Sequence, residues 1–263
     1  MDIVVCMKAV PSTTEVKMDP VTNTIVRDGG EAVVNPFDAS ALEVALQLKE
    51  SAVTGACTVG VLSMGIPATE SLLRDAIARG ADRATLLTDR AFAGADTLAT
   101  TYALSCGIRI HGALPDLIIC GKMAVDGDTA QIGPELAGTF GIPCVSDVTR
   151  IVSFDGSSLT VVHGADAGAE TVRIELPAVI TVSKDIAQLR MPSIAGIRAA
   201  EQAEVTVLSA ADAAADVARC GLSGSPTQVV RSFVPQRERD SIAVTGDAGE
   251  QARKLVALFK EVA

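Results

Sequence analysis

A short polar loop between two apolar segments holds the residues of this chain best suited to bind a ligand. The loop, residues 121–131, follows the apolar run 117–120 and precedes a helical pattern over residues 132–140. Its small residues let a ligand approach the backbone, and unpaired N–H groups at a helix start can hold phosphate. The sequence therefore indicates a nucleotide-binding loop, with a plain strand-to-helix turn capped by Asp or Thr as an equal alternative.

The sequence lacks the residues of common catalytic machinery. The two histidines, His111 and His163, fit surface or structural positions better than a catalytic triad. The motifs G-x-S-x-G, H-E-x-x-H, G-x-x-x-x-G-K-[ST] and G-x-G-x-x-G do not occur. Asp126 and Asp128 have no histidine or third carboxylate nearby, which favours helix capping or ribose binding over a metal site. The sequence thus indicates a binder, or a protein whose chemistry belongs to a cofactor.

The composition predicts a soluble globular protein. Hydrophobic residues make up 48% of the 263 residues, which is enough for a large core. No stretch approaches the roughly 20 apolar residues that a membrane span needs. A net charge of −10 argues against a nucleic-acid partner. Six scattered cysteines without a C-x-x-C pair favour free thiols, and with no signal-peptide pattern we expect a cytoplasmic location.

Strand and helix patterns alternate along the first 140 residues. The predicted strands are residues 2–10, 57–64, 83–88 and 117–120. The predicted helices are residues 39–50, 69–79, 96–111 and 132–140. This alternation predicts an α/β fold, in which helices cover both faces of a parallel-core sheet. In such a sheet, ligands bind outside the carboxyl ends of the strands.

The pattern changes from residue 144 onward. Segments 148–154, 159–164 and 171–182 are strand-like and separated by turns, so they predict antiparallel strands added to the sheet. Residues 199–207 are predicted to form a further strand, and the Ala-rich residues 210–219 a helix.

The last part of the chain has little periodicity before a final amphipathic helix at residues 249–262. We therefore expect an α/β domain over residues 1–220 and a C-terminal arm over residues 221–263. Such an arm is suited to wrapping a partner, with a solvated tail as the alternative.

Several long motifs, in order, resemble the β subunit of electron transfer flavoproteins along essentially the whole chain. They are VVCMKAVPSTTEVKMDP, NPFDASALEVALQLKE, SMG, RGADRATLLTDRAFAGADTLAT, CGKMAVDGDTAQIGP, ELPAVITV and GSPTQVVRSFVP. The resemblance implies an adenine-nucleotide-binding domain of the HUP-like type. It also implies a heterodimer with an electron transfer flavoprotein α subunit, which carries a flavin and on which the C-terminal arm packs.

The resemblance implies one of two nucleotides in this subunit. It is AMP in the simple electron carriers of the family and a second FAD in the electron-bifurcating members. The stretches VDGDTAQIGP and GSPTQVVRSFVP resemble the bifurcating form. That form implies hydride transfer from NADH to the β-subunit FAD. One electron then passes to ferredoxin or flavodoxin, and the other passes through the α-subunit FAD to an acyl-CoA dehydrogenase-like partner. A one-flavin carrier with structural AMP, or a stand-alone nucleotide-binding module, are the alternatives.

Matching the family motifs by position also implies the site residues. The nucleotide contacts are Cys6, Asn35, Pro36, Phe37, Asp38, Ser63, Gly121, Lys122, Met123, Ala124, Val125, Asp126, Gly127, Asp128, Thr129, Ala130, Gln131 and Ile132. Thr13 matches a loop near the α-subunit flavin, and Ile194 matches the apolar anchor that docks dehydrogenase partners. The basic residues common after that anchor are replaced by Ala199, Ala200 and Glu201, a departure that leaves the docking mode open. No residue is expected to act in catalysis or to bind a metal.

The expected roles follow from the chemistry of these groups. Backbone N–H groups of residues 127–131 are expected to hold phosphate at the helix start, against the nearby acidic side chains. Asn35 or Asp126 is expected to hydrogen-bond the ribose or the adenine, and Cys6 and Ser63 are small enough to admit the ring.

Overall fold

The computed structural model describes residues 1–12, 32–51, 56–230 and 241–262. Thr13, predicted to lie near the partner's flavin, is outside the described residues. The chain divides into two compact units, Met1–Val229 and Val230–Ala263.

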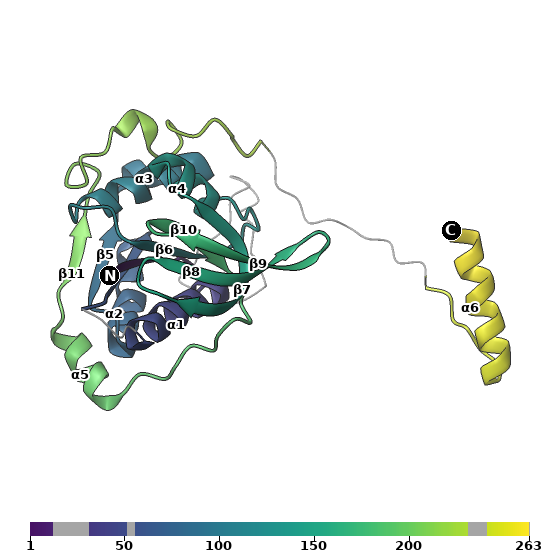
Figure 1. Cartoon of the computed structure of the whole chain (residues 1–263). Coiled ribbons are helices and arrows are strands. Elements are labelled where there is room, and N and C mark those ends of the chain that lie inside the picture. Colours follow the sequence, from purple (N-terminus) through teal and green to yellow (C-terminus); the bar gives the residue numbers. More distant parts are fainter. Residues whose placement is uncertain (13–31, 52–55, 231–240, 263) are drawn as a thin grey trace. The chain divides into compact units, whose positions relative to one another are not determined.

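A nine-stranded sheet forms the centre of the first unit (Figure 1). Its strand order is β11-β5-β4-β1-β6-β10-β7-β8-β9. Neighbouring strands are parallel from β11 to β7 and antiparallel from β7 to β9. The strands are β1 (Asp2–Cys6), β4 (Thr58–Met64), β5 (Arg83–Leu87), β6 (Leu117–Gly121), β7 (Cys144–Phe154), β8 (Ser158–Ala165), β9 (Gly168–Glu175), β10 (Ala178–Val182) and β11 (Val205–Leu208). The predicted α/β class, with a parallel core and antiparallel additions, is confirmed.

Helices cover both faces of this sheet (Figure 1). Helices α1 (Pro36–Ser51) and α2 (Glu70–Arg79) pack on one face, and α3 (Thr97–Arg109) and α4 (Ile132–Phe140) pack on the other. Helix α5 (Ile194–Gln202) packs on α2. The remaining elements are the strand pair β2 (Ala9–Pro11) and β3 (Ala32–Val34), the short helices η1 (Pro67–Thr69), η2 (Arg90–Phe92) and η3 (Val217–Arg219), and α6 (Ala248–Val262) in the second unit.

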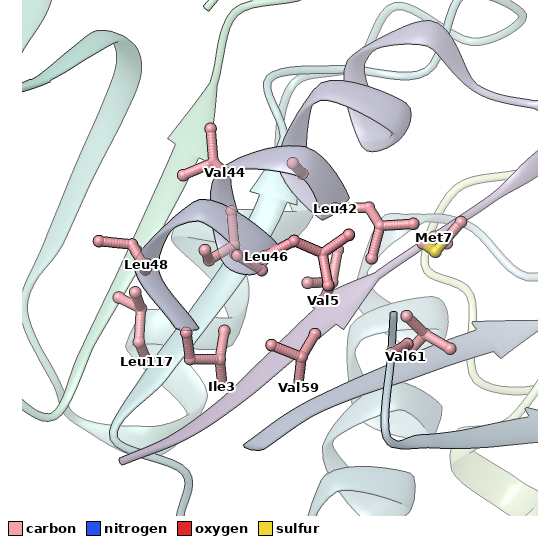
Figure 2. Close-up of a cluster of buried hydrophobic side chains, with 14 of the residues drawn as sticks. Ile3, Val5, Met7, Leu42, Val44, Leu46, Leu48, Val59, Val61 and Leu117 are labelled. Carbon is pink, nitrogen blue, oxygen red and sulfur yellow. The ribbon is translucent and has the colours of Figure 1, made fainter. Parts of the chain in front are cut away.

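The central strands are apolar on both sides because both faces of the sheet are buried. In β1, Ile3 and Val5 face the cluster that includes α1, whereas Val4 and Cys6 belong to the opposite cluster. Figure 2 shows Ile3, Val5 and Met7 beside apolar side chains of α1, among them Leu42 and Leu46. This packing fixes the position of α1 against the end of β1, where the sequence predicts the site.

The structure corrects four predicted elements. The predicted strand 2–10 divides into β1 and β2, which belong to different sheets. The segment 171–182 is not one added strand, because it divides at Leu176–Pro177 into β9 and β10. Strand β10 lies in the parallel core between β6 and β7. Residues 199–202 belong to α5, and only Val205–Leu208 form a strand. The predicted helix over 210–219 is wrong, since this stretch forms turns and the short η3.

Residues 221–229 belong to the first unit. The backbone N–H of Leu222 donates to the carbonyl oxygen of Ala93 at 3.2 Å. The hydroxyl of Thr227 donates to Asp96, the N-cap of α3, at 2.8 Å. The start of the stretch that the sequence assigns to the arm is therefore held on the α/β unit.

Helix α6 of the second unit matches the predicted final helix. Its apolar side chains Leu255, Val256 and Phe259 are all exposed. Within the described part of the chain, no helix has the length and apolar composition that crossing a membrane requires.

Candidate functional site

The carboxyl ends of three neighbouring strands meet at the predicted site. Cys6 at the end of β1 pairs with Leu62 of β4 on one side and with Cys120 of β6 on the other. Because these strands are parallel, Ser63 and Gly121 end at the same edge of the sheet. The structure thus brings together the predicted residues from β1, β4 and the loop after β6.

Asn35 holds the loop in place from the start of α1. Its side-chain Nδ2 donates to the carbonyl oxygen of Met123 at 2.9 Å, and its Oδ1 accepts from the backbone N–H of Val125 at 3.2 Å. The side chain is buried. Both polar atoms of this side chain, which the sequence analysis expects to bind ribose or adenine, are therefore engaged with the protein. Asn35 supports the shape of the loop.

Asp38 joins the ends of β1 and β6 from the first turn of α1. Its Oδ2 accepts from the backbone N–H of Lys8 at 2.8 Å, and its Oδ1 accepts from the backbone N–H of Gly121 at 3.1 Å. The residue is only 6% exposed. Burial raises the pKa of its carboxyl to about 7, although the hydrogen bonds from Lys8, Asn35 and Gly121 oppose that shift. Asp38 therefore holds the ends of β1 and β6 together at the candidate site, as Asn35 holds the loop.

This pKa predicts a pH dependence of stability. The Asp38 carboxyl has a pKa of about 7 in the folded chain and 3.8 as an ordinary carboxyl, so between these values only the folded chain keeps the proton. The stability of the natural chain relative to Asp38→Asn, which cannot titrate, should fall as the pH rises from about 4 to about 7 and then level off. The slope can reach about 1.4 kcal/mol per pH unit. Urea unfolding of both chains across this range measures it, and a constant difference would contradict the assignment.

Pro36 and Phe37 complete the first turn of α1. Pro36 is the first residue of the helix, a position where its missing N–H costs nothing. A side chain at Gly121 would meet Phe37 and Asp38, so this position needs glycine for the close approach of α1 to the end of β6. The packing explains why the loop begins abruptly at Gly121.

Two lysines lie just beyond the ends of β1 and β6. The Lys8 Nζ, just beyond β1, is 2.6 Å from the Asp126 carboxylate. The Lys122 Nζ is 2.9 Å from Asp147 of β7, which has a φ of 54° and donates its backbone N–H to the Thr181 hydroxyl at 3.0 Å. The sequence analysis missed Lys8 and Asp147. Only the position of Lys8, two residues after the predicted strand-end contact Cys6, could have indicated its role.

The middle of the loop is a tight turn. The backbone N–H groups of Gly127 and Asp128 donate to the carbonyl oxygen of Ala124, at 3.2 and 2.8 Å. Two of the N–H groups expected to bind phosphate are therefore used within the turn. Those of residues 129–131 have no acceptor among the described residues. Ile132 then begins α4.

Strain in the loop gives a further prediction. Asp128 and Ala130 have φ values of 50° and 55°, in the left-handed region that costs a non-glycine residue about 1 kcal/mol. The Ala130→Gly variant should therefore raise the free energy of unfolding by about 0.5–1 kcal/mol. The control is Ala93→Gly, where φ is −67° and the same change should lower stability. Denaturant titration distinguishes the two, and a loss of stability in both variants would contradict the strain.

Ser63 has the one buried side-chain oxygen without a hydrogen-bond partner among the described residues. Its residue is 1% exposed, and a buried hydroxyl left unpaired costs about 1–3 kcal/mol. Such a group at the predicted site fits a ligand that would supply the missing partner. Cys6 and Cys120, also buried, line the strand ends with thiols that are poor hydrogen-bond donors.

The arrangement can bind a polar ligand. It combines two lysines with a hydroxyl and backbone N–H groups that have no partner among the described residues. Within the described residues, no three histidine, cysteine or carboxylate side chains are placed to hold a metal ion.

Ile194 lies elsewhere, as the first residue of α5 on the α2 side of the sheet. It is 76% exposed, and the neighbouring Met191 is 83% exposed. The sequence analysis did not single out Met191, which precedes Pro192 in the same segment.

Comparison with known proteins gives the family. The model of the electron transfer flavoprotein domain matches residues 22–213. The electron transfer flavoprotein subunit beta of Thermoanaerobacterium thermosaccharolyticum is 44% identical, over 97% of this chain and 96% of that protein. The same subunit of Megasphaera elsdenii is 43% identical, over 98% of both chains. The caffeyl-CoA reductase-Etf complex subunit CarD of Acetobacterium woodii is 40% identical, over 99% and 98%. The chain therefore belongs to the electron transfer flavoprotein family and is similar to its β subunits along almost its whole length.

Proposed function

We propose that this chain is the β subunit of a heterodimeric electron transfer flavoprotein of the electron-bifurcating type, with FAD at the carboxyl ends of β1, β4 and β6. The observation that carries the placement of FAD is the buried hydroxyl of Ser63, which has no partner among the described residues. It lies at the same sheet edge as the loop whose N–H groups at residues 129–131 also have no acceptor there. The loop sequence VDGDTAQIGP, which resembles that of bifurcating members, supports FAD over AMP.

The described residues suggest how FAD would be held. Backbone N–H groups of residues 129–131 and the ammonium groups of Lys8 and Lys122 would bind its phosphates, offsetting Asp126 and Asp128. The Ser63 hydroxyl would pair with a polar atom of the nucleoside. Asn35 and Asp38 would keep the loop and the strand ends in position. Bound FAD would supply hydride acceptance from NADH and the release of single electrons.

The proposal includes three protein partners, with NADH as the electron donor. An α subunit with its own FAD would contact Thr13 and the C-terminal arm, where α6 exposes an apolar face. Ferredoxin or flavodoxin would take one electron from NADH, and an acyl-CoA dehydrogenase-like protein would take the other. The similarity to a subunit of a caffeyl-CoA reductase-Etf complex supports an acceptor that acts on CoA esters. All these partners fit a cytoplasmic location.

The test is NADH oxidation by the purified heterodimer, with ferredoxin and an acyl-CoA dehydrogenase plus its enoyl-CoA substrate. We expect rapid oxidation only when both acceptors are present, because bifurcation couples the two electron paths. A heterodimer that does not oxidise NADH, but whose flavin is reduced by the dehydrogenase with an acyl-CoA as electron donor, would instead be a simple carrier with AMP in this subunit. No electron transfer to either acceptor would reject the proposed function.

A further inference from the structure

Exposed apolar side chains lie on α5 and at Met191, three residues before the helix begins. Met191, Ile194 and Ile197 are 83%, 76% and 44% exposed. Helix α5 is regular at this point, because its N-cap Ser193 accepts from the backbone N–H of Gly196 at 2.9 Å. These three side chains, here called the docking surface, include the predicted anchor for the dehydrogenase partner.

The helix that carries the docking surface is held firmly on α2. Arg74 of α2 donates to the carbonyl oxygens of Ala200 and Ala203, at 2.9 and 2.8 Å, at the end of α5. Gly196 lies so close to the carbonyl of Ala78 that a side chain there would not fit. Both ends of the helix are therefore fixed.

The segment that leads into α5, residues 183–193, is held on α1 and is here called the strap. The hydroxyl of Ser40 lies 2.6 Å from the carbonyl oxygen of Lys184 and 2.9 Å from that of Ala187. These contacts hold the beginning of the strap against the N-terminal half of α1.

Arg190 holds the end of the strap, immediately before Met191. Its guanidinium binds the Glu43 carboxylate at two points, with Nε to Oε2 at 3.0 Å and Nη2 to Oε1 at 2.9 Å. Its backbone N–H also donates to Glu43, at 3.0 Å. Glu50 accepts from the same guanidinium, and Arg79 of α2 donates to the Arg190 carbonyl oxygen. One residue thereby ties the strap to both helices.

The Glu43–Arg190 pair is a partly buried ion pair and not an exposed surface pair. The Glu43 side chain is 6% exposed. Burial alone would raise the pKa of Glu43, but the hydrogen bonds from Arg190 outweigh it and hold that pKa below its ordinary value. A buried carboxylate left without its guanidinium would be strongly unfavourable, so the pair fixes one position for the strap.

We propose that Arg190 is a positioning residue that holds the docking surface in the geometry its electron-accepting partner binds. This inference rests on the proposed function, since it assumes that the partner binds at Met191 and Ile194. Arg190 would not touch the partner. Its contribution is preorganisation, because apolar side chains on a strap that is already fixed lose less conformational freedom on binding. Arginine is required because a lysine cannot make the two-point contact with Glu43.

The test measures electron transfer from the complete heterodimer to a purified acyl-CoA dehydrogenase. For Arg190→Gln we expect the KM for the dehydrogenase to rise about tenfold, since side chains on a freed strap lose more conformational freedom on binding. The rate at saturating dehydrogenase and the flavin content should not change. Arg190→Lys should raise the KM less. The control is Arg173→Gln on β9, which removes an arginine that pairs with Asp155 and Glu175 on an exposed surface.

The outcomes separate this inference from the proposed function. If the natural heterodimer does not reduce the dehydrogenase, the proposed function fails before the variants are compared. If it does, and Arg190→Gln keeps the natural KM or loses only the saturating rate, the positioning role is overturned. Should Arg190→Gln fail to fold, Arg190→Lys decides by the same criterion. Faster hydrogen exchange in the strap alone, together with the raised KM, would support the role, whereas a lower Tm with an unchanged KM would reject it.

Discussion

The Asp38→Ala variant is expected to have a free energy of unfolding about 3 kcal/mol below that of the natural chain at pH 6. The change leaves the backbone N–H groups of Lys8 and Gly121 without their acceptor, and each such buried donor costs about 1–3 kcal/mol. The measurement is made at pH 6, below the Asp38 pKa of about 7. The carboxyl is then mostly protonated, so its removal relieves little buried charge. Urea unfolding followed by circular dichroism is suitable, since the chain has no tryptophan.

Asp38→Asn is the matched control for that prediction. Its amide keeps one acceptor oxygen of similar shape, so one of the two N–H groups stays paired, and we expect about half the loss. A loss below about 1 kcal/mol for Asp38→Ala would show that the two strand ends do not depend on this carboxylate.

The Gly127→Leu variant is expected to lower the nucleotide content of this subunit at least about tenfold, a change that needs a steric cost of only about 1.4 kcal/mol. Gly127 is exposed, and among the described residues no atom lies within 4 Å of the position a Cβ would take. The leucine therefore fits the free chain but occupies space that the proposed ligand needs. Nucleotide released by heat is separated by chromatography and counted per heterodimer, and we expect the FAD count to fall from two to about one because the α-subunit FAD remains.

Gly138→Leu is the control for Gly127→Leu. Gly138 lies in α4, and a Cβ added there would likewise meet no atom of the described chain within 4 Å. This variant should retain its nucleotide. Natural nucleotide content in Gly127→Leu would remove the loop from the binding site.

The sequence was sufficient to predict the parallel core, because its strands are buried on both faces and end at clear turn residues. The predicted helix 132–140 has the bounds of α4, which ends at Gly141 in the left-handed conformation. The loop before it was found from its small and polar residues alone. These features depend on local sequence, which explains why they could be read without the structure.

The errors arise where distant contacts decide the local structure. Alanines predicted a helix over 210–219, yet Asp212 and Asp216 bind nearby hydroxyl and N–H groups that favour turns. Tyr102 of α3 accepts from the backbone N–H of Asp216, and its ring lies 3.8 Å from the Arg219 guanidinium. The position of β10 between β6 and β7 also could not be predicted, because strand order depends on pairing between segments that are remote in the sequence.

The contacts that hold the candidate site and the strap in place also could not be predicted from the sequence. The resemblance assigned Asn35 and Asp38 to the predicted nucleotide site. It did not predict their hydrogen bonds to Met123 and Gly121, which lie more than 80 residues away in the sequence. The Glu43–Arg190 pair joins residues 147 positions apart. Such contacts follow from tertiary packing and carry no local pattern.

The most direct test of this account is the nucleotide content of the protein purified with its α subunit. Heat-released nucleotides are separated by chromatography and counted per heterodimer. The account predicts two FAD and no AMP, with the second FAD lost in Gly127→Leu. One FAD with one AMP would contradict the bifurcating function while keeping the site. One FAD alone, with no nucleotide in this subunit, would contradict the site at the ends of β1, β4 and β6.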